Sequence, residues 1–378
     1  MTHDPRAEIP GQAGDGVVAR VPPPQPDTAA DAPTSPPSPR TRSEASSRPA
    51  TDRGPAGIRV HDLTKSFGEI EAVAGVDLAV PQGAVFGLLG PDGAGKSTLI
   101  RMLATVLVPD SGDAEIFGIS AAHSPDKLTP RIGYMSQRFS MYPDLSVAEN
   151  LEFFARVRGV PRPRRRERAA DLLESMGMAP FAKRQARLLS GGMKQKLMLA
   201  STLMHSPDLL LLDEPTTGVD PVSRREFWRI LAGIHAEGRT VLVATPYMDE
   251  AERCTHVGFL DAGRITHTGT PQDLKDAVPG TLVEVIAADP HAALAVLREQ
   301  PGITGAHLLG NTVRVLVATD HRPDQKPPSA GGRDTRPPAP AIAHVRKILA
   351  EAGIAADVHP IAMDMESVFA HLAERVPA

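Results

Sequence analysis

The chain has 378 residues, of which 41% are hydrophobic and 23% are charged, and its formal net charge is −4. This length and apolar content can supply one large domain or two ordinary ones, which excludes a wholly disordered chain. The charge balance provides no general attraction to nucleic acid, and a single cysteine, Cys254, excludes an internal disulfide. No apolar run approaches the ~18 to 20 residues of a membrane-spanning helix, so we expect none.

Residues 1–56 consist largely of Pro, Ala, Ser, Thr and Arg, with almost no large apolar side chain. Such a segment cannot offset the conformational entropy that folding removes. We therefore expect a disordered, proline-rich tail before the first folded domain.

Residues 57–278 alternate between strand and helix patterns. Apolar runs predict a strand near Ile58 and buried strands at 84–89, 209–212 and 240–244. Apolar residues at helical spacing predict helices at 96–107, 147–157, 166–176, 190–204 and 221–235. This alternation indicates an α/β domain with a mostly parallel sheet and a mainly helical insert before residue 204.

After about residue 279 the elements become shorter. Strands are predicted at 282–287 and 312–317, and helices at 291–299 and 341–352. The order strand, helix, strand, strand, helix, strand suggests a small α+β domain of the ferredoxin-like kind over 279–378. A Pro-, Gly- and Arg-rich stretch at 320–340 predicts a flexible loop inside it.

A complete phosphate-binding loop follows the strand at 84–89. It consists of Gly90, Pro91, Asp92, Gly93, Ala94, Gly95, Lys96, Ser97 and Thr98. Its glycines let several backbone amides face phosphate oxygens, and the helix that begins at Lys96 adds its positive end. In the P-loop motif of this form, the lysine neutralises the β- and γ-phosphates of a nucleotide and the hydroxyl of Ser97 binds Mg²⁺.

An acidic pair follows the four leucines at 209–212. At the end of a buried strand, Asp213 is predicted to hold Mg²⁺ through water, and Glu214 to orient or deprotonate the attacking water.

Together with Leu-Ser-Gly-Gly-Met at 189–193, these motifs resemble the nucleotide-binding subunit of an ABC (ATP-binding cassette) transporter, over roughly residues 58–275. The resemblance implies a P-loop NTPase fold with a helical signature subdomain, and ATP with Mg²⁺ as ligands. It further implies that Ser190, Gly191 and Gly192 contact the γ-phosphate held by an opposing subunit. Two cassettes would then meet head to tail, in the simplest case as a homodimer.

The resemblance also assigns three single residues. Phe67 matches the aromatic position that stacks on adenine, with a core phenylalanine as the alternative. Gln137 matches the hinge glutamine that senses Mg²⁺ and the attacking water, and Asp220 lies in the loop that crosses to the other subunit. With Lys96 and Glu214, Gln137 completes the predicted catalytic set.

Two residues depart from the family pattern. Asp92 stands where relatives usually have Asn, which places a carboxylate near the phosphates. Pro246 stands where the family has the His that reaches the γ-phosphate, and proline offers neither a side-chain donor nor a backbone N–H. We expect slow hydrolysis, with Tyr247 as one candidate replacement donor, and we keep as alternative a catalytically weakened regulatory or structural cassette.

The chain is similar to the ATPases of ABC-2-type exporters, which include drug-efflux subunits, in the segment 137–142, at Met193 and in the run at 363–369. This implies an ATPase docked on an ABC-2-type membrane permease at the cytoplasmic face of the cell membrane, without a nucleic-acid partner. Cargo would be recognised by membrane helices that this chain lacks. A cassette ATPase that acts on ribosomes would usually carry two cassettes in one chain, and one that acts on DNA would carry long coiled-coil heptads. The sequence shows neither feature.

The arginine-rich segment 162–168 is either a solvated helix start or a contact for anionic headgroups.

Overall fold

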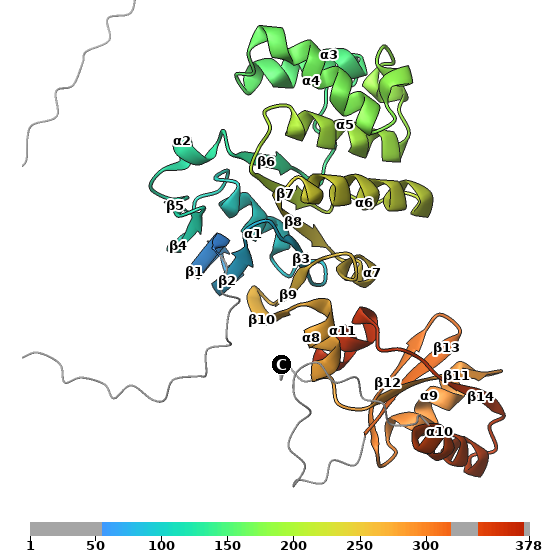
Figure 1. Cartoon of the computed structure of the whole chain (residues 1–378). Helices are drawn as coiled ribbons and strands as arrows, with labels where there is room; N and C mark the ends of the chain where they lie inside the picture. Colours follow the sequence, from blue (N-terminus) through green and yellow to red (C-terminus); the bar gives the residue numbers. More distant parts are fainter. Residues whose placement is uncertain (1–54, 319–338, 374–378) are drawn as a thin grey trace, which may run out of the picture. The chain divides into compact units, whose positions relative to one another are not determined.

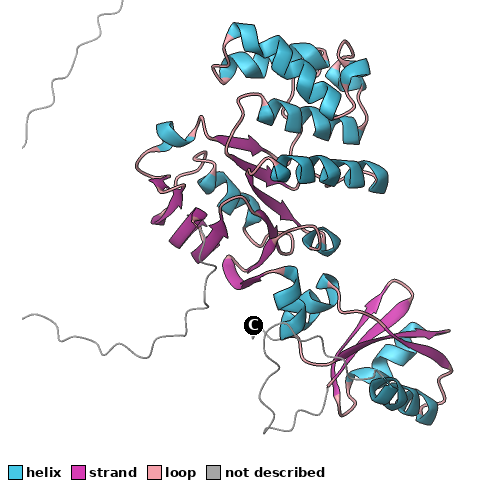
Figure 2. Ribbon diagram, viewed as in Figure 1, coloured by secondary structure: helices cyan, strands magenta, loops and turns pink. Residues whose placement is uncertain are grey.

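The computed structural model describes residues 55–318 and 339–373 (Figures 1 and 2). The predicted tail up to residue 54 and the predicted loop at 320–338 lie outside the described residues. The helices are α1 (Lys96–Leu103), α2 (Pro125–Leu128), α3 (Val147–Val157), α4 (Arg162–Ser175), α5 (Gly191–Leu203), α6 (Pro221–Ala236), α7 (Met248–Ala251), α8 (Pro271–Ala277), α9 (Pro290–Arg298), α10 (Ala339–Glu351) and α11 (Met365–Ala373). Two 3₁₀ turns, Ala179–Phe181 and Ala186–Leu188, lie between α4 and α5.

The strands form three sheets. They are β1 (Ala56–Phe67), β2 (Ile70–Pro81), β3 (Val85–Leu89), β4 (Ser111–Ile116), β5 (Ile119–Ser120), β6 (Ile132–Met135), β7 (Leu209–Asp213), β8 (Thr240–Thr245), β9 (His256–Asp261), β10 (Arg264–Gly269), β11 (Thr281–Ala287), β12 (Ile303–Leu309), β13 (Thr312–Val317) and β14 (Ala356–Pro360). The strand orders are β10-β9-β3-β8-β7-β6, β2-β1-β4-β5 and β12-β13-β11-β14.

The first of these sheets is the predicted parallel one. Strands β9, β3, β8, β7 and β6 run parallel, and only the edge strand β10 is antiparallel to its neighbour. The register pairs Leu89 with Thr245 and Asp213 with Ala244. The carboxyl ends of the central strands therefore meet at one edge of the sheet.

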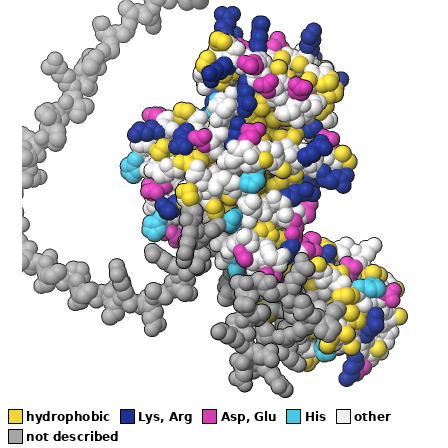
Figure 3. Space-filling model, viewed as in Figure 1, with side chains coloured by type: hydrophobic (Ala, Val, Ile, Leu, Met, Phe, Trp, Pro, Cys, Tyr) yellow, Lys and Arg dark blue, Asp and Glu magenta, His cyan; other side chains and the backbone are white. Residues whose placement is uncertain are grey.

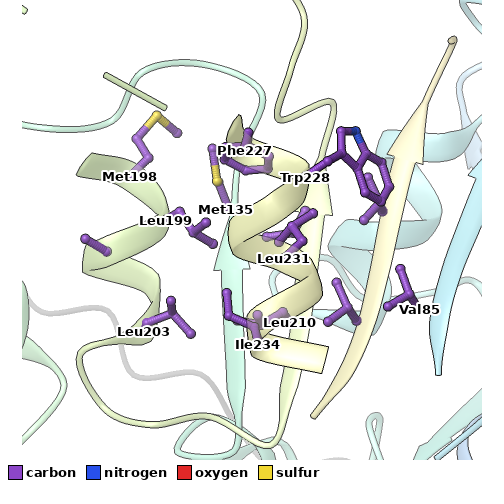
Figure 4. Close-up of a cluster of buried hydrophobic side chains, with 14 of the residues drawn as sticks. Val85, Met135, Met198, Leu199, Leu203, Leu210, Phe227, Trp228, Leu231 and Ile234 are labelled. Atoms are coloured by element: carbon purple, nitrogen blue, oxygen red, sulfur yellow. The ribbon is translucent and has the colours of Figure 1, made fainter. Parts of the chain in front are cut away.

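Both faces of this sheet are covered, which explains why its strands read as unbroken apolar runs. Leu210 and Leu212 belong to the core shared with α5 and α6, whereas Leu209 and Leu211 belong to the core shared with α1 and the second sheet. This split follows from the two-residue period of a strand. Figure 4 shows side chains of α5 and α6, including Leu203 and Leu231, gathered on the first of these faces.

The second sheet was not expected from the sequence. Strands β1 and β2 form a long antiparallel hairpin, and β1 also pairs with β4 in antiparallel register. Register shifts at Leu63 and near Ser66 interrupt the hairpin ladder, and they break the simple alternation that would identify a strand.

Two predicted helix boundaries are wrong. Helix α1 ends at Leu103 rather than at residue 107, because Thr105 adopts a φ of +58° that a helix cannot continue. Helix α4 begins at Arg162 rather than at 166, since prolines at positions 161 and 163 suit the cap and first turn of a helix. The arginine-rich segment is thus the start of α4, and Figure 3 shows Lys and Arg side chains projecting from this helical region at the top of the view.

The C-terminal elements follow the predicted order. The strand order β12-β13-β11-β14 is wholly antiparallel, and α9 and α10 pack into its apolar core. The last helix, α11, behaves differently, because Met365 and Val368 are buried in the core that also contains Val257 of β9. The rings of Phe259 and Phe369 have centroids 5.4 Å apart. The boundary at residue 278 stays a prediction, but α11 packs with the preceding domain.

Among the described helices, none is both long enough and apolar enough to cross a bilayer.

Candidate active site

The carboxyl edge of the parallel sheet gathers four loops. Gly90 follows β3, Pro246 follows β8 and Glu214 follows β7, while Gln137 lies two residues beyond β6. These strands are consecutive neighbours in the sheet. Ligands of open α/β sheets bind at this edge, so the strand order alone places the predicted residues around one crevice.

In the phosphate-binding loop, residues 90–98, two glycines occupy positions where any side chain would collide with backbone atoms. A Cβ at Gly90 would lie 2.1 Å from the carbonyl oxygen of Leu260, and one at Gly95 would lie 2.1 Å from that of Ala72. Gly93 has open space around it, but its φ of +84° favours glycine. Helix α1 starts directly after Gly95 with no side-chain cap, so its first amides remain available to a ligand.

Lys96 is held inside this loop. Its ammonium nitrogen donates to the carbonyl oxygens of Gly90 and Pro91, both at 2.8 Å, and lies 4.0 Å from a carboxylate oxygen of Glu214. The side chain is only 4% exposed. Burial lowers the pKa of Lys96, and the negative charges of Glu214, Asp92 and Asp213 oppose that shift. A buried cation needs partners of this kind, because an unpaired charge away from water costs free energy.

Two of the three residues predicted for the metal site, Ser97 and Asp213, touch each other, while the third, Gln137, bonds to Glu214. The hydroxyl of Ser97 donates to Oδ1 of Asp213 at 2.8 Å, while Oδ2 of Asp213 is buried and has no hydrogen-bond partner in the part of the chain that the structure describes. Burial raises the pKa of Asp213, with the Ser97 hydrogen bond opposing it. An unpaired buried carboxylate oxygen beside a hydroxyl is the donor chemistry that a hard divalent cation prefers, so these residues fit Mg²⁺.

Glu214 is fixed by two side chains. Its Oε2 accepts from the Gln137 amide at 2.8 Å and from the Thr217 hydroxyl at 3.1 Å. The residue is 7% exposed, and its φ of +48° is unusual for a residue with a side chain. Strained backbone of this kind gathers at functional sites. The structure thus brings Lys96, Ser97, Asp213, Glu214 and Gln137 together.

The remaining predicted phosphate-contact residues form a second group. Ser190 is the exposed N-cap of α5, with its hydroxyl accepting from the amide of Met193 at 3.3 Å. Asp220 caps α6 by accepting from the amides of Val222 at 3.1 Å and Ser223 at 2.9 Å. The Ser223 amide bond is the largest of the effects that lower the pKa of Asp220.

The two helix starts lie side by side. A Cβ on Gly192 would come within 2.5 Å of the Ser223 side chain, and one on Gly191 would be 3.7 Å from the carbonyl oxygen of Gly218. We call Ser190, Gly191 and Gly192 the signature turn. Among the described residues, no hydrogen bond joins its side chains to the phosphate-binding loop.

Phe67 is not a core residue. Its side chain is 50% exposed at the end of β1, with the ammonium group of Lys65 lying 5.8 Å from its ring centroid. The core alternative is therefore wrong, and the ring is free to stack on a ligand.

The segment after β8 carries the departure from the family pattern. Pro246 is partly buried, and the amide of Tyr247 donates to the Thr245 hydroxyl at 3.1 Å. The Tyr247 ring lies against the guanidinium group of Arg224, 4.0 Å from its centroid. Whether Tyr247 replaces the missing donor stays a prediction. Sequence reasoning did not single out Thr217 or Arg224, although the paired threonines after Glu214 were a visible signal.

Comparison with known proteins gives consistent matches. Residues 73–217 match the family model described as ABC transporter. The probable multidrug ABC transporter ATP-binding protein YbhF of Escherichia coli (strain K12) is 45% identical over 222 residues, which are 59% of this chain and 38% of that protein. The chain therefore spans well under half the length of that relative.

Two other relatives are matched over most of their length. The daunorubicin/doxorubicin resistance ATP-binding protein DrrA of Streptomyces peucetius is 40% identical, over 65% of this chain and 76% of that protein. The daunorubicin resistance ATP-binding protein DrrA3 of Streptomyces coeruleorubidus is 36% identical, over 83% of this chain and 95% of that protein.

Among solved structures, the dimeric structure of MJ0796, a bacterial ABC transporter cassette, aligns with a TM-score of 0.53 and 27% identity, over 56% of this chain and 98% of that one.

Proposed function

The chain belongs to the family of ABC transporter ATP-binding proteins, and from that premise we propose that it binds and hydrolyses ATP to power an ABC-2-type export transporter. The observation that carries the proposal is the contact network at the carboxyl edge of the sheet, where Lys96, Ser97, Asp213, Glu214 and Gln137 meet. Each of these groups has a part in phosphoryl transfer to water.

The cradle holds the triphosphate. Backbone amides of residues 90–98 and the start of α1 face the phosphate oxygens, and Lys96 exchanges its carbonyl partners for the β- and γ-phosphates. Ser97 and Asp213 would hold Mg²⁺, which would neutralise the negative charge that develops on the phosphate oxygens. Glu214 accepts a proton from the attacking water, and the Gln137 and Thr217 bonds keep its carboxylate aimed.

The site also needs a second cassette. Ser190, Asp220 and Phe67 are exposed, and the first two only cap their own helices in the single chain. In the proposed dimer, the signature turn of one chain covers the γ-phosphate held by the other, and Phe67 stacks on adenine. The MJ0796 cassette to which the chain is similar is described as dimeric, which supports this arrangement.

The exporter assignment follows from the relatives. Two of them are resistance proteins for daunorubicin, and YbhF is described as a probable multidrug transporter protein. We infer that a separate ABC-2-type permease recognises a drug-like cargo and docks this chain at the cytoplasmic face of the membrane. The alternative of a weakened regulatory cassette rests on Pro246 alone.

Replacing Glu214 with Gln tests the function directly. Cells that express the chain with its permease should lose export, and the purified full-length variant should bind ATP while phosphate release falls by on the order of 10²-fold or more. Glu252→Gln, which alters an exposed carboxylate paired with Lys275, should change neither. Export that continues unchanged in Glu214→Gln would refute the catalytic assignment, and purification of the chain from membranes with a multi-helix partner would identify the permease.

A further inference from the structure

A carboxyl group outside the phosphate site is buried between two loops of the catalytic edge. Glu250 of α7 is 0% exposed, and its Oε1 accepts a hydrogen bond from the Thr216 hydroxyl at 2.6 Å. Thr216 is itself 1% exposed. We propose that this hydrogen bond makes Thr216 and Glu250 positioning residues for ATP hydrolysis, an inference that rests on the function proposed above.

Thr216 is placed to control the loop on which hydrolysis depends. It lies two residues after Glu214 and four before Asp220. Within this loop the amide of Thr217 donates to the Glu214 carbonyl at 3.3 Å, and the amide of Val219 donates to the Thr216 carbonyl at 3.2 Å. Anchoring the Thr216 side chain therefore fixes two consecutive turns, one holding the catalytic carboxylate and the other leading to the crossing loop.

Glu250 connects that loop to the segment after β8. It lies four residues beyond Pro246, and Arg224 of α6 places its Nε 3.8 Å from Glu250 Oε1. The same guanidinium group covers the Tyr247 ring at 4.0 Å and lies 3.8 Å from Asp249. One cluster thus joins the Glu214 loop, the start of α6 and the Pro246 segment.

The chemistry of the cluster favours positioning over simple stability. Within residues 55–318 and 339–373, neither Glu250 Oε2 nor Arg224 Nε has a hydrogen-bond partner, and both are buried, which costs free energy that an apolar side chain would not. A short hydroxyl–carboxyl bond in this setting is directional and poorly replaced by packing. In this chain the segment also lacks a side-chain donor at position 246, so its placement depends on the groups that remain.

Thr216→Val tests the hydrogen bond because it keeps the shape of the side chain and removes the donor. In the full-length protein we expect the kcat for phosphate release to fall by on the order of 10-fold, because small misplacements of catalytic groups are costly. The KM and the affinity for ATP should stay within about 2-fold, because the phosphate cradle is formed by other residues. Thr216→Ser retains the hydroxyl and should restore most of the kcat.

Two further variants separate positioning from general stability. Thr240→Val is the matched control, since Thr240 is also 1% exposed and its hydroxyl accepts from the Gly83 amide at 2.9 Å. Thr240→Val should lower the melting temperature about as much as Thr216→Val does, without changing kcat. Glu250→Met should lower kcat as much as Thr216→Val does. The kcat of the double variant should be no lower than that of either single variant, as expected for two halves of one interaction.

The outcomes are distinguishable. The inference is overturned if Thr216→Val retains the wild-type kcat, if Thr240→Val loses as much, if Thr216→Ser fails to recover, or if KM rises in place of the fall in kcat. Each of these outcomes includes measurable phosphate release by the wild-type protein, so the proposed function stands. A wild-type protein that binds ATP and releases no phosphate would instead overturn the proposed function, and this inference with it.

Discussion

The phosphate cradle and the signature turn are prepared for ATP to different degrees. In the cradle, three charged residues are buried and hydrogen-bonded. Lys96 bonds to loop carbonyls, Asp213 to Ser97, and Glu214 to Gln137. At the signature turn, Ser190 is exposed and only caps its own helix. For the proposed dimer, the difference implies that only the phosphate-holding half of the shared site would be organised before the partner chain binds.

The largest expected effect comes from breaking the organised half. In Lys96→Met the cradle loses its buried cation, so ATP affinity should fall by on the order of 10²-fold or more and phosphate release should become undetectable. Binding of a fluorescent ATP analogue to the full-length protein would measure it. The matched control is Lys275→Met, which removes an ammonium paired with Glu252. Equal affinity in Lys96→Met and wild type would contradict the assignment.

A mixing experiment tests whether the second half acts on a partner. Ser190→Arg should abolish hydrolysis by blocking the signature turn, while the lost cap costs only about 1 kcal/mol of stability. Mixed with Lys96→Met, it should form heterodimers that each contain one intact site. Phosphate release should recover to about a quarter of the wild-type value, because half of the random dimers are mixed and each has one working site. A mixture as inactive as its components would show that the two halves do not combine between chains.

Pro246 directly follows β8, and its replacement should have a smaller effect. Pro246→His restores a side-chain donor near the γ-phosphate, so the rate of phosphate release should rise by on the order of 10-fold. Pro271→His, at the first residue of α8, is the control for a proline replacement elsewhere. An unchanged or lower rate in Pro246→His would refute the expectation of a weakened site.

The smallest effect concerns the stability of the cradle without ligand. Burial raises the pKa of Asp213 above its usual 3.8, so folding favours the protonated form. This contribution to stability is complete below the unfolded pKa and is lost as the pH rises through the folded pKa. Asp213→Asn does not ionise, so it should be more stable than wild type near neutral pH, by about 1 kcal/mol. Urea unfolding should show that difference shrinking as the pH falls from neutral towards 3.8, and a constant difference over that range would exclude the titration as its cause.

Local sequence was sufficient where the relevant residues are contiguous. The strand–loop–helix order around residues 90–98, the acidic pair at the end of β7 and the starts of α5 and α6 were all predicted within a residue. The order of strands and helices along the C-terminal region was also predicted, because each element is a short contiguous pattern. The antiparallel β1–β2 hairpin was missed because its ladder is irregular, and the burial of α11 was missed because its partners are distant in the chain.

The sequence by itself determined which chemistry the chain carries, since glycine spacing, a lysine at a helix start and acids after a buried strand are local patterns. Only the tertiary structure decided which groups meet. Gln137 and Glu214 are 77 residues apart, and Thr216 and Glu250 are 34 apart. Their contacts depend on parallel strands ending side by side and on helices packing across them, and these are contacts between segments that are distant in the chain.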